Sequence, residues 1–402
     1  MKEKIISIVV VALAFSLLVG ILFRVNYLIT PEFSGGDSFR VPWMGARTFL
    51  FTENNPYLAE TAEETQIAIY GQPAEEGQYP YRLDTPFYLL IFYFPFALIK
   101  DFDQARALWM SLAEISLFAV GFLSIYLAEW KSSRVSLVLF FSTLFLSFYG
   151  LYPLFEGSGT IFTALILLLA LVALREKWEE VLGILLLFST FHLQKGALLL
   201  FFILFLIIAA RRWRVFSIFA MSFVVVVAIT LIIFPDWIIP FAGSLRANLR
   251  VGQGLLFSET LQVWQPDDGK IIANITKWIA LLLLFIEWRS ARGKDFPRLL
   301  WVASLSIVMT PFLDIRITPD LFPYFFLPLV LFLKTIRSRW ENAKWGIPFL
   351  FILLLSSWVI FTQSTHAFEI LTFAFPFILG ISLYWMRWWL IRPPRTWVDQ
   401  IK

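Results

Sequence analysis

The chain has 402 residues, of which 59% are hydrophobic and only 15% are charged. A soluble domain carries about 25% charged residues, so this chain lacks the polar side chains that would cover a water-exposed globule. Apolar runs long enough for membrane helices recur from residue 5 to residue 386. The composition therefore excludes a soluble enzyme, a disordered chain and a fibrous protein, and it predicts an all-α polytopic membrane protein.

The remaining bulk properties exclude several kinds of site and partner. The formal net charge of +4 is small for this length and argues against nucleic acid as a partner. No cysteine is present, so the chain has no disulfide, no thiolate metal site and no cysteine nucleophile. Two histidines, His192 and His366, leave little material for an imidazole metal site. The sequence indicates no cofactor and no metal ligands, and it leaves the use of a divalent ion open.

The first apolar run, residues 5–30, begins like a signal sequence. Its apolar stretch is too long for a signal peptide, and Pro31-Glu32-Phe33 offers no small-residue cleavage site. A helix that spans the hydrocarbon core needs about 20 apolar residues. We therefore expect this run to remain as the first transmembrane helix.

Twelve further apolar segments follow. They cover residues 86–99, 107–128, 135–153, 160–174, 181–193, 196–210, 215–234, 271–286, 299–313, 321–336, 346–362 and 368–386. Segment 86–99 is short and carries Pro86 and Pro95, so we expect it to dip into the membrane and return. The chain then has about 12 transmembrane helices, or 13 if this segment crosses.

The distribution of lysine and arginine predicts the orientation, because cytoplasmic loops are enriched in positive charge. With a cytoplasmic N-terminus, most basic residues lie inside and the two long loops, 31–85 and 236–270, lie outside. Loop 31–85 holds nine acidic residues and three arginines. We expect one transmembrane domain over residues 1–402 in the cell membrane, with these two loops forming an active-site face outside.

Asp37 follows two glycines and precedes the amphipathic stretch 39–51. This stretch is expected to form an interfacial helix, with Phe39 and Trp43 at the lipid headgroups and Arg40 in the polar layer. Asp37 has two interpretations. Aspartate is a good N-cap residue, so it could simply begin the helix. Alternatively, a carboxylate held at the membrane surface could take a proton from a hydroxyl group.

His192 and Lys195 stand in the short outer turn between segments 181–193 and 196–210. Ionisable side chains in such a stretch are costly unless they are paired or solvated, so they mark a candidate functional site. Lys195 could pair with a lipid phosphate, or it could snorkel to the surface from a tight turn. His192 could contribute to the same site or be a hydrogen-bonded structural residue.

Four further polar residues fall on the same outer face. Glu156 begins a short turn, and Arg316 stands in the loop 314–320 and could add to the same cavity. Arg246 and Arg250 share one helix face through their i, i+4 spacing, which suits a phosphate or an anionic lipid surface. This clustering predicts an outward-facing polar cavity. No P-loop, dinucleotide motif, HExxH or nucleophile elbow occurs.

The layout resembles the GT-C glycosyltransferases that use polyprenyl-phosphate sugars, and within them glycosyltransferase family 87, which contains bacterial α-mannosyltransferases. The resembling positions are Asp37 after the first span, Asn55-Pro56-Tyr57, Tyr79-Pro80-Tyr81 through Pro86, the Lys195 turn with Arg211-Arg212-Trp213-Arg214, and Thr310-Pro311 before Pro323 and Pro328. The resemblance covers most of the chain through loose motifs. It departs at Glu156-Gly157, where the family often shows Gln-Asn, and at Asp314-Ile315-Arg316, where the branch tends to carry Trp and His.

The resemblance implies a GT-C-like bundle that transfers a sugar, such as the hexose mannose, from a polyprenyl-phosphate donor to a lipid or glycan acceptor at the outer face. It implies an inverting reaction with Asp37 as the general base. Lys195, Arg246 and Arg250 are then the candidates for holding the donor phosphate, with His192, Glu156, Arg316 and Arg40 as further substrate-binding candidates. The expected partners are donor, acceptor and membrane lipids. The alternative is a lipid-linked sugar transporter or flippase, which would need charges at the midplane and broken helices.

Overall fold

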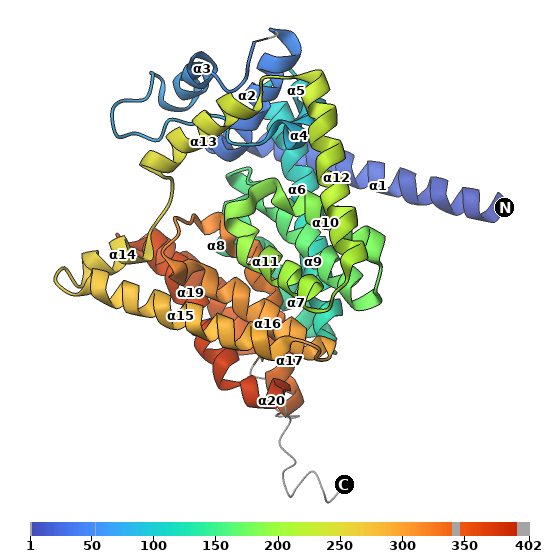
Figure 1. Cartoon of the computed structure of the whole chain (residues 1–402), viewed down its shortest axis with the longest axis vertical. Coiled ribbons are helices and arrows are strands. Elements are labelled where there is room, and N and C mark those ends of the chain that lie inside the picture. The colour runs from blue at the N-terminus through green and yellow to red at the C-terminus, as the bar shows by residue number, and fades with distance from the viewer. Residues whose placement is uncertain (1, 53, 340–345, 392–402) are drawn as a thin grey trace, which may run out of the picture. The chain divides into compact units, whose positions relative to one another are not determined.

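The computed structural model describes residues 2–52, 54–339 and 346–391 (Figure 1). The chain is about 80% helical. Within the described ranges it contains no β-strand, and Leu255 and Ile317 form one isolated bridge. The all-α fold predicted from the sequence is confirmed.

Most helices follow one another with short connections, and the longest connection in the described ranges is residues 71–86. In chain order they are α1 (Lys2–Ile29), α2 (Asp37–Phe51), α3 (Ala59–Tyr70), α4 (Phe87–Leu90), η1 (Ile91–Tyr93), α5 (Phe94–Ala97), α6 (Phe102–Ala128), α7 (Arg134–Leu146), α8 (Phe148–Phe155), α9 (Thr160–Glu176), α10 (Glu179–Phe188), η2 (Ser189–His192), α11 (Leu193–Ala209), α12 (Trp213–Ile233), α13 (Ile238–Val251), α14 (Phe257–Trp264), α15 (Gly269–Ala291), α16 (Phe296–Met309), η3 (Thr310–Leu313), η4 (Pro319–Phe325), α17 (Phe326–Arg339), α18 (Gly346–Gln363), α19 (Ala367–Trp385) and α20 (Arg387–Ile391).

Eight helices or helix pairs among the described residues are long and apolar enough to cross a membrane. They are Ala12–Ile29, Phe102–Ala128, Trp213–Ile233, Gly269–Ala291, Phe296–Leu313, Pro319–Arg339, Gly346–Gln363 and Ala367–Trp385. A ninth arises if α7 and α8, which meet at a 40° bend, form one broken span. The protein is a multi-pass membrane protein, as the composition predicts.

The number of long apolar helices is smaller than the 12 or 13 crossings expected from the sequence. Some of the expected spans are divided by breaks, and α9 and α11 are continuous but only 17 residues long. The expected span 181–193 contains α10, which has 10 residues and ends where the chain tightens into η2. Segment 86–99 contains only the short helices of 87–97, roughly 16 Å at 1.5 Å per residue, about half the thickness of a hydrocarbon core.

Burial separates helices that face outward from helices that form a core. In α12 the side chain of Ile232 is 82% exposed, and in α1 that of Leu17 is 67% exposed. By contrast, almost every residue of η4 and the first half of α17 is buried. Large exposed apolar surfaces on α1 and α12 are what lipid-facing helices require.

The chain divides into two compact units, each assembled from separate stretches. The first unit contains Met1–Ser116, Leu154–Gly159 and Ile229–Val251, and the second contains Leu117–Pro153, Thr160–Ala228 and Gly252–Lys402. The single transmembrane domain expected from the sequence stays a prediction.

The core of the first unit is an aromatic cluster between α2, α5 and α6. The ring of Phe39 stacks 5.0 Å from that of Trp109, and Tyr93 stacks on the same indole at 4.9 Å. Trp43 donates from Nε1 to the carbonyl oxygen of Phe96. Helix α2 is therefore present where the sequence predicts it, but the expectation that Phe39 and Trp43 meet lipid headgroups is wrong. Both are buried, because α2 packs its aromatic face on α5 and α6.

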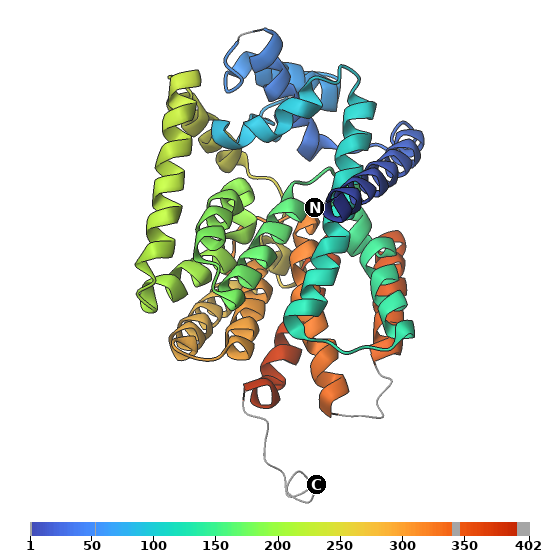
Figure 2. The ribbon, with the colours of Figure 1, turned by 90° about the vertical axis from the view of Figure 1, so that its right-hand side faces the viewer.

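In the second unit, α15, α16 and α19 pack side by side, and α7 lies against α18 (Figure 2). A buried ion cluster joins three of its helices. Glu287 of α15, which is 1% exposed, accepts from Arg298 of α16 and from Nε of Arg387 of α20 at 2.7 Å. Both guanidinium groups also lie over the ring of the buried Trp301. Paired in this way, Glu287 and Arg298 are buried without an isolated ion, and the half-buried Arg387 adds a second cation.

The predicted orientation can be tested by labelling, because the wild-type chain contains no cysteine. Glu63→Cys in α3 and Ala242→Cys in α13 replace exposed side chains of the two long loops, and Lys294→Cys replaces an exposed residue between α15 and α16. We expect an impermeant maleimide to label the first two variants in intact cells and the third only after permeabilisation. The opposite labelling pattern would overturn the orientation.

Candidate functional site

Asp37 begins α2, but it does not cap it. The N-cap residue is Gly36, whose φ of 85° lies in the left-handed region, and no side-chain capping bond is present. Among the described residues, the Asp37 carboxylate has no hydrogen-bond or ion-pair partner. The capping interpretation is therefore wrong, and the structure gives this carboxylate no structural role.

Arg106, near the start of α6, explains why two glycines precede Asp37. Its guanidinium group is buried and donates to the carbonyl oxygens of Phe33 and Phe155, each at 2.9 Å. The side chain then passes against the glycine pair. A Cβ atom on Gly36 would lie 2.7 Å from Nε of Arg106, and one on Gly35 would lie 2.9 Å from the Phe155 carbonyl oxygen. Only glycine leaves room for this arginine, and both glycines also have positive φ angles.

The charge environment of Asp37 combines partial burial with two nearby cations. Burial raises the pKa of the Asp37 carboxyl group above its ordinary value, although the positive charges of Arg40 and Arg106 oppose the shift. The guanidinium carbon of Arg40 lies 3.6 Å from the ring centre of Phe102, and its buried Nε has no hydrogen-bond partner in the described part of the chain. Asp37 is thus a carboxylate with increased proton affinity beside an arginine that is held by stacking.

Glu156 lies in the same unit as Asp37. Ser38, the residue after Asp37, donates from Oγ to Oε1 of Glu156 at 3.0 Å. Gly157, which follows Glu156, has a φ of 68°, and its carbonyl oxygen accepts a hydrogen bond from Nε1 of Trp109 at 2.9 Å. The turn predicted at Glu156 is present, and its hydrogen bonds fix it against the start of α2 and against α6.

A tyrosine cluster stands beside this acidic region. Tyr81 contacts Tyr70 and Tyr79 edge-on at 5.4 and 5.0 Å. Its φ of 43° is uncommon for a residue with a side chain, and such strain often marks a functional position. Burial raises the pKa of the Tyr81 hydroxyl, and the negative charges of Asp37 and Glu156 raise it further. Tyr81 therefore stays a neutral donor close to both carboxylates.

The backbone next to Tyr81 is attached to α13. Asn248 accepts from the amide nitrogen of Arg82 at 3.2 Å and donates to the Arg82 carbonyl oxygen at 2.7 Å. Arg246 and Arg250 stand two positions from Asn248, which is about 200° around a helix, so they occupy the opposite face. Both arginines are exposed. The predicted shared face is confirmed, and no ion pair to either arginine occurs among the described residues.

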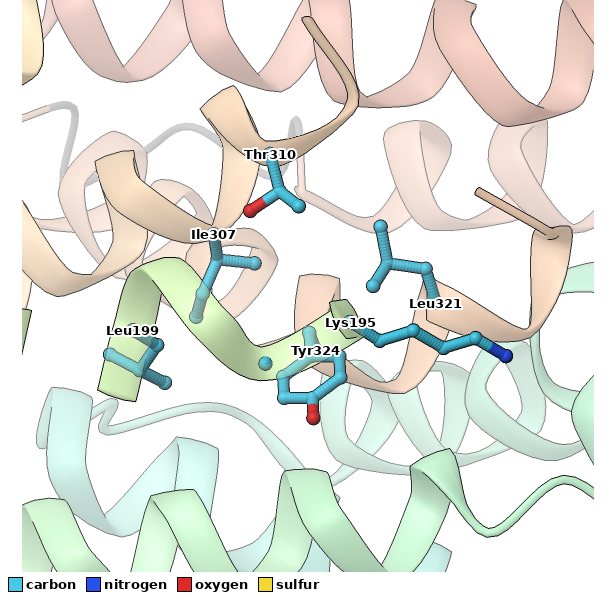
Figure 3. A pocket seen from close by; sticks show the side chains of 7 residues that line it. Lys195, Leu199, Ile307, Thr310, Leu321 and Tyr324 are labelled. Carbon is cyan, nitrogen blue, oxygen red and sulfur yellow. The ribbon is translucent and has the colours of Figure 1, made fainter. Parts of the chain in front are cut away.

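Lys195 is paired with an acid that the sequence analysis did not select. Its ammonium group forms an ion pair with Asp320 of η4, which is 1% exposed and also accepts from Thr160 at 3.1 Å and from Thr318. Lys195 also borders a cavity of only about 10 Å³, room for a single water molecule. In Figure 3, Leu199 and Ile307 lie on one side of this cavity, and the ammonium group of Lys195 points away from them. The snorkelling interpretation is wrong, and the ion pair neutralises the charge predicted to bind phosphate.

Arg316 is also engaged within the second unit. It forms two hydrogen bonds with the carboxylate of Glu259, at 2.7 and 3.1 Å, and donates to the Gly254 carbonyl oxygen. Asp314 completes this connection by accepting from the amide nitrogen of Ser258 at the start of α14. Arg316 therefore holds the loop before α14 against 314–318, instead of lining an open cavity.

The predicted site is thus brought together only in part. Asp37, Arg40 and Glu156 meet in the first unit, and Lys195 and Arg316 are paired in the second. His192 lies in η2, and the expectation for its side chain falls outside the described residues. No group of three histidine, aspartate or glutamate residues is placed to hold a metal ion in the described ranges.

Arg106, Tyr81 and Asp320 are the residues that sequence reasoning missed. Arg106 stands one position before the predicted apolar segment 107–128, and Asp320 one position before the segment 321–336. The rule that a membrane-buried ion needs an opposite partner could have linked Lys195 to Asp320.

The fit of Arg106 against Gly36 can be tested with a matched pair of substitutions. Gly36→Ala and Gly71→Ala both place a side chain at a left-handed position, with φ of 85° and 79°, but only Gly36 has an atom within 4 Å of the new Cβ. We expect Gly71→Ala to cost about 1–2 kcal/mol of unfolding free energy, and Gly36→Ala to cost about 2 kcal/mol more through overpacking. Thermal unfolding in detergent measures both. Equal losses would show that Arg106 moves freely.

The ion pair of Lys195 can be tested by removing one partner and then both. Lys195→Met leaves the Asp320 carboxylate unpaired and should cost about 3–5 kcal/mol of stability. In the double variant Lys195→Met/Asp320→Leu we expect most of this loss to be recovered. Lys270→Met, which changes an exposed lysine of α15, is the control. If Lys195→Met alone were as stable as wild type, the ion pair would not have a structural role.

Comparisons with models of protein families, with curated proteins and with solved structures returned no match to this chain.

Proposed function

We propose that this membrane protein is a glycosyltransferase of the GT-C type, which transfers a sugar from a polyprenyl-phosphate donor to a lipid or glycan acceptor, with Asp37 as the general base. The main observation behind the proposal is that the Asp37 carboxylate has no hydrogen-bond or ion-pair partner among the described residues. It is a half-buried carboxylate without a structural partner, held at a helix start beside Arg40. A charged group kept in this way without a structural use is a candidate for chemistry.

The chemistry of such a transfer fits these residues. The donor already carries phosphate as a leaving group, so the enzyme has to activate the acceptor hydroxyl and stabilise the charge on the departing phosphate. Asp37 takes the hydroxyl proton while the acceptor oxygen bonds to the anomeric carbon. The bond from that carbon to the phosphate oxygen breaks, and the phosphate leaves with the electron pair. A single displacement of this kind inverts the anomeric configuration and needs no metal ion.

Arg40 is the cation best placed to serve the departing phosphate. Stacking on Phe102 holds its guanidinium group, and in the described part of the chain no carboxylate forms an ion pair with it. Guanidinium groups bind phosphate through two parallel hydrogen bonds. The structure supports Arg40 over Lys195, because Asp320 neutralises Lys195. Arg246 and Arg250 remain exposed candidates on α13 for contacts with lipid phosphate.

The finer features of the proposal rest on the sequence. The cell-membrane location and the extracytoplasmic position of Asp37 follow from the distribution of basic residues. A hexose such as mannose as the transferred sugar follows from the resemblance to glycosyltransferase family 87. Tyr70 and Tyr81, which interact electrostatically with Asp37, add aromatic surface and hydroxyl groups that suit a sugar ring, and Tyr79 packs edge-on against Tyr81.

Asp37→Asn tests this function. The amide cannot accept the proton, so we expect sugar transfer to fall by about 10²–10⁴-fold. Because burial raises the pKa of Asp37, its ionised form weakens the folded state as pH rises through that pKa, and the neutral amide removes this penalty. The variant should therefore unfold at a temperature no lower than wild type at neutral pH.

Two measurements complete the test. The wild-type rate should decline as pH falls through the raised pKa of Asp37, and the residual activity of the variant should lack this decline. Glu63→Gln, which neutralises an exposed acid of α3, should leave both rate and stability unchanged. An Asp37→Asn variant that retains more than about a tenth of wild-type turnover would remove Asp37 from the chemistry.

A further inference from the structure

A groove between α2 and α3 lies apart from Asp37 within the first unit. Its volume is about 260 Å³, and its walls include Trp43, Arg47, Thr48, Phe51, Thr52 and Glu64. Asp37 stands at the start of α2, whereas Arg47 and Phe51 follow ten and fourteen residues later, roughly 15–21 Å along the helix axis. The groove is therefore a separate feature from the carboxylate assigned to the chemistry.

Arg47 forms a fixed part of the groove wall. Its Nη1 donates to the carbonyl oxygens of Ala97 at 2.8 Å and Ile99 at 3.3 Å, which attaches the side chain to the end of α5. The guanidinium carbon lies 5.2 Å from the ring centre of Trp43 and 5.1 Å from that of Phe51. In the described part of the chain, Nε and Nη2 of Arg47 have no hydrogen-bond partner. These donors are held in place and are available to a ligand.

Glu64 supplies an acceptor on the wall formed by α3. Its side chain is exposed, and within the described ranges no lysine or arginine nitrogen lies within 4.0 Å of its carboxylate. Arg47 and Glu64 therefore border the same groove without pairing with each other. Phe51 adds an aromatic ring that is 56% exposed. The groove offers a fixed donor, a separate acceptor and an apolar face.

We propose that this groove binds a single neutral sugar ring. The hydroxyl groups of a pyranose can donate to the Glu64 carboxylate and accept from Arg47, while its C–H face packs on Phe51. A phosphate or another anion fits less well, because Glu64 would repel the charge that Arg47 attracts. The volume lies just below the roughly 300–1,000 Å³ of pockets for drug-sized ligands, as expected for one ring. Identifying this ring as part of the sugar acceptor rests on the proposed function, but the binding itself does not.

The test measures binding directly and needs no transfer activity. Purified protein in phosphatidylcholine nanodiscs, which carry no sugar headgroup, is titrated with methyl α-mannoside, methyl α-glucoside and methyl α-galactoside. Saturation-transfer NMR reports contact between the protein and each glycoside. We expect at least one glycoside to bind, and Glu64→Gln or Phe51→Ala to weaken its binding about tenfold, as for loss of a charged hydrogen bond or an aromatic contact.

Two control variants distinguish binding in this groove from effects of other acidic residues in the first unit. Glu63→Gln changes the neighbouring exposed acid, which does not line the groove, and should bind as wild type does. Asp37→Asn should also bind the glycoside fully, so a failure of the proposed reaction would leave this inference intact. If no glycoside binds, or if Glu64→Gln binds as wild type does, the groove is not a sugar site. Binding of glycerol phosphate that displaces the glycoside would assign the groove to a lipid headgroup and overturn the proposal.

Discussion

The buried guanidinium group of Arg106 is the constraint on which the start of α2 depends. It donates to the carbonyl oxygens of Phe33 and Phe155, so the chain before α2 and the last residue of α8 are joined to α6 by one side chain. Two glycines make room for it, and Asp37 follows at once. A buried guanidinium group that donates to otherwise unpaired carbonyl oxygens can stabilise the local backbone conformation strongly. The position of Asp37 is therefore set by the packing of an arginine, and not by a capping bond of its own.

The charged residues that the sequence selected for the site fall into two groups according to whether they have ion-pair partners. Lys195 and Arg316 are neutralised by Asp320 and Glu259, and these pairs connect parts of the second unit. Asp37 and Arg40 lack such partners in the described part of the chain. Unpaired charges that are partly withdrawn from water keep a high free energy, which a substrate can lower by binding. This difference supports a catalytic role for Asp37 and a structural role for Lys195, whereas the sequence alone left the role of each residue open.

The sequence predicted the fold class and the location of α2 because both depend on local composition and periodicity. The sequence also predicted that segment 86–99 is too short for a full span; the structure has only short helices there, and the dip into the membrane stays a prediction. The expected crossings outnumber the long apolar helices of the described ranges, because α9, α10 and α11 have only 17, 10 and 17 residues. The pairing of Lys195 with Asp320 was not predicted, because the two residues are 125 positions apart and meet only in the folded chain. The role of the glycine pair was likewise hidden, because it depends on Arg106.

The proposed role of Asp37 is in a group transfer and not in the passage of a lipid across the membrane. The most direct measurement follows a radiolabelled sugar on a polyprenyl-phosphate donor, presented to purified protein in liposomes with a pool of lipid and glycan acceptors. We expect the label to move into a new glycosidic bond with inverted anomeric configuration. Movement of intact donor between leaflets, without a new glycosidic bond for any sugar offered, would exclude the transfer and favour a flippase.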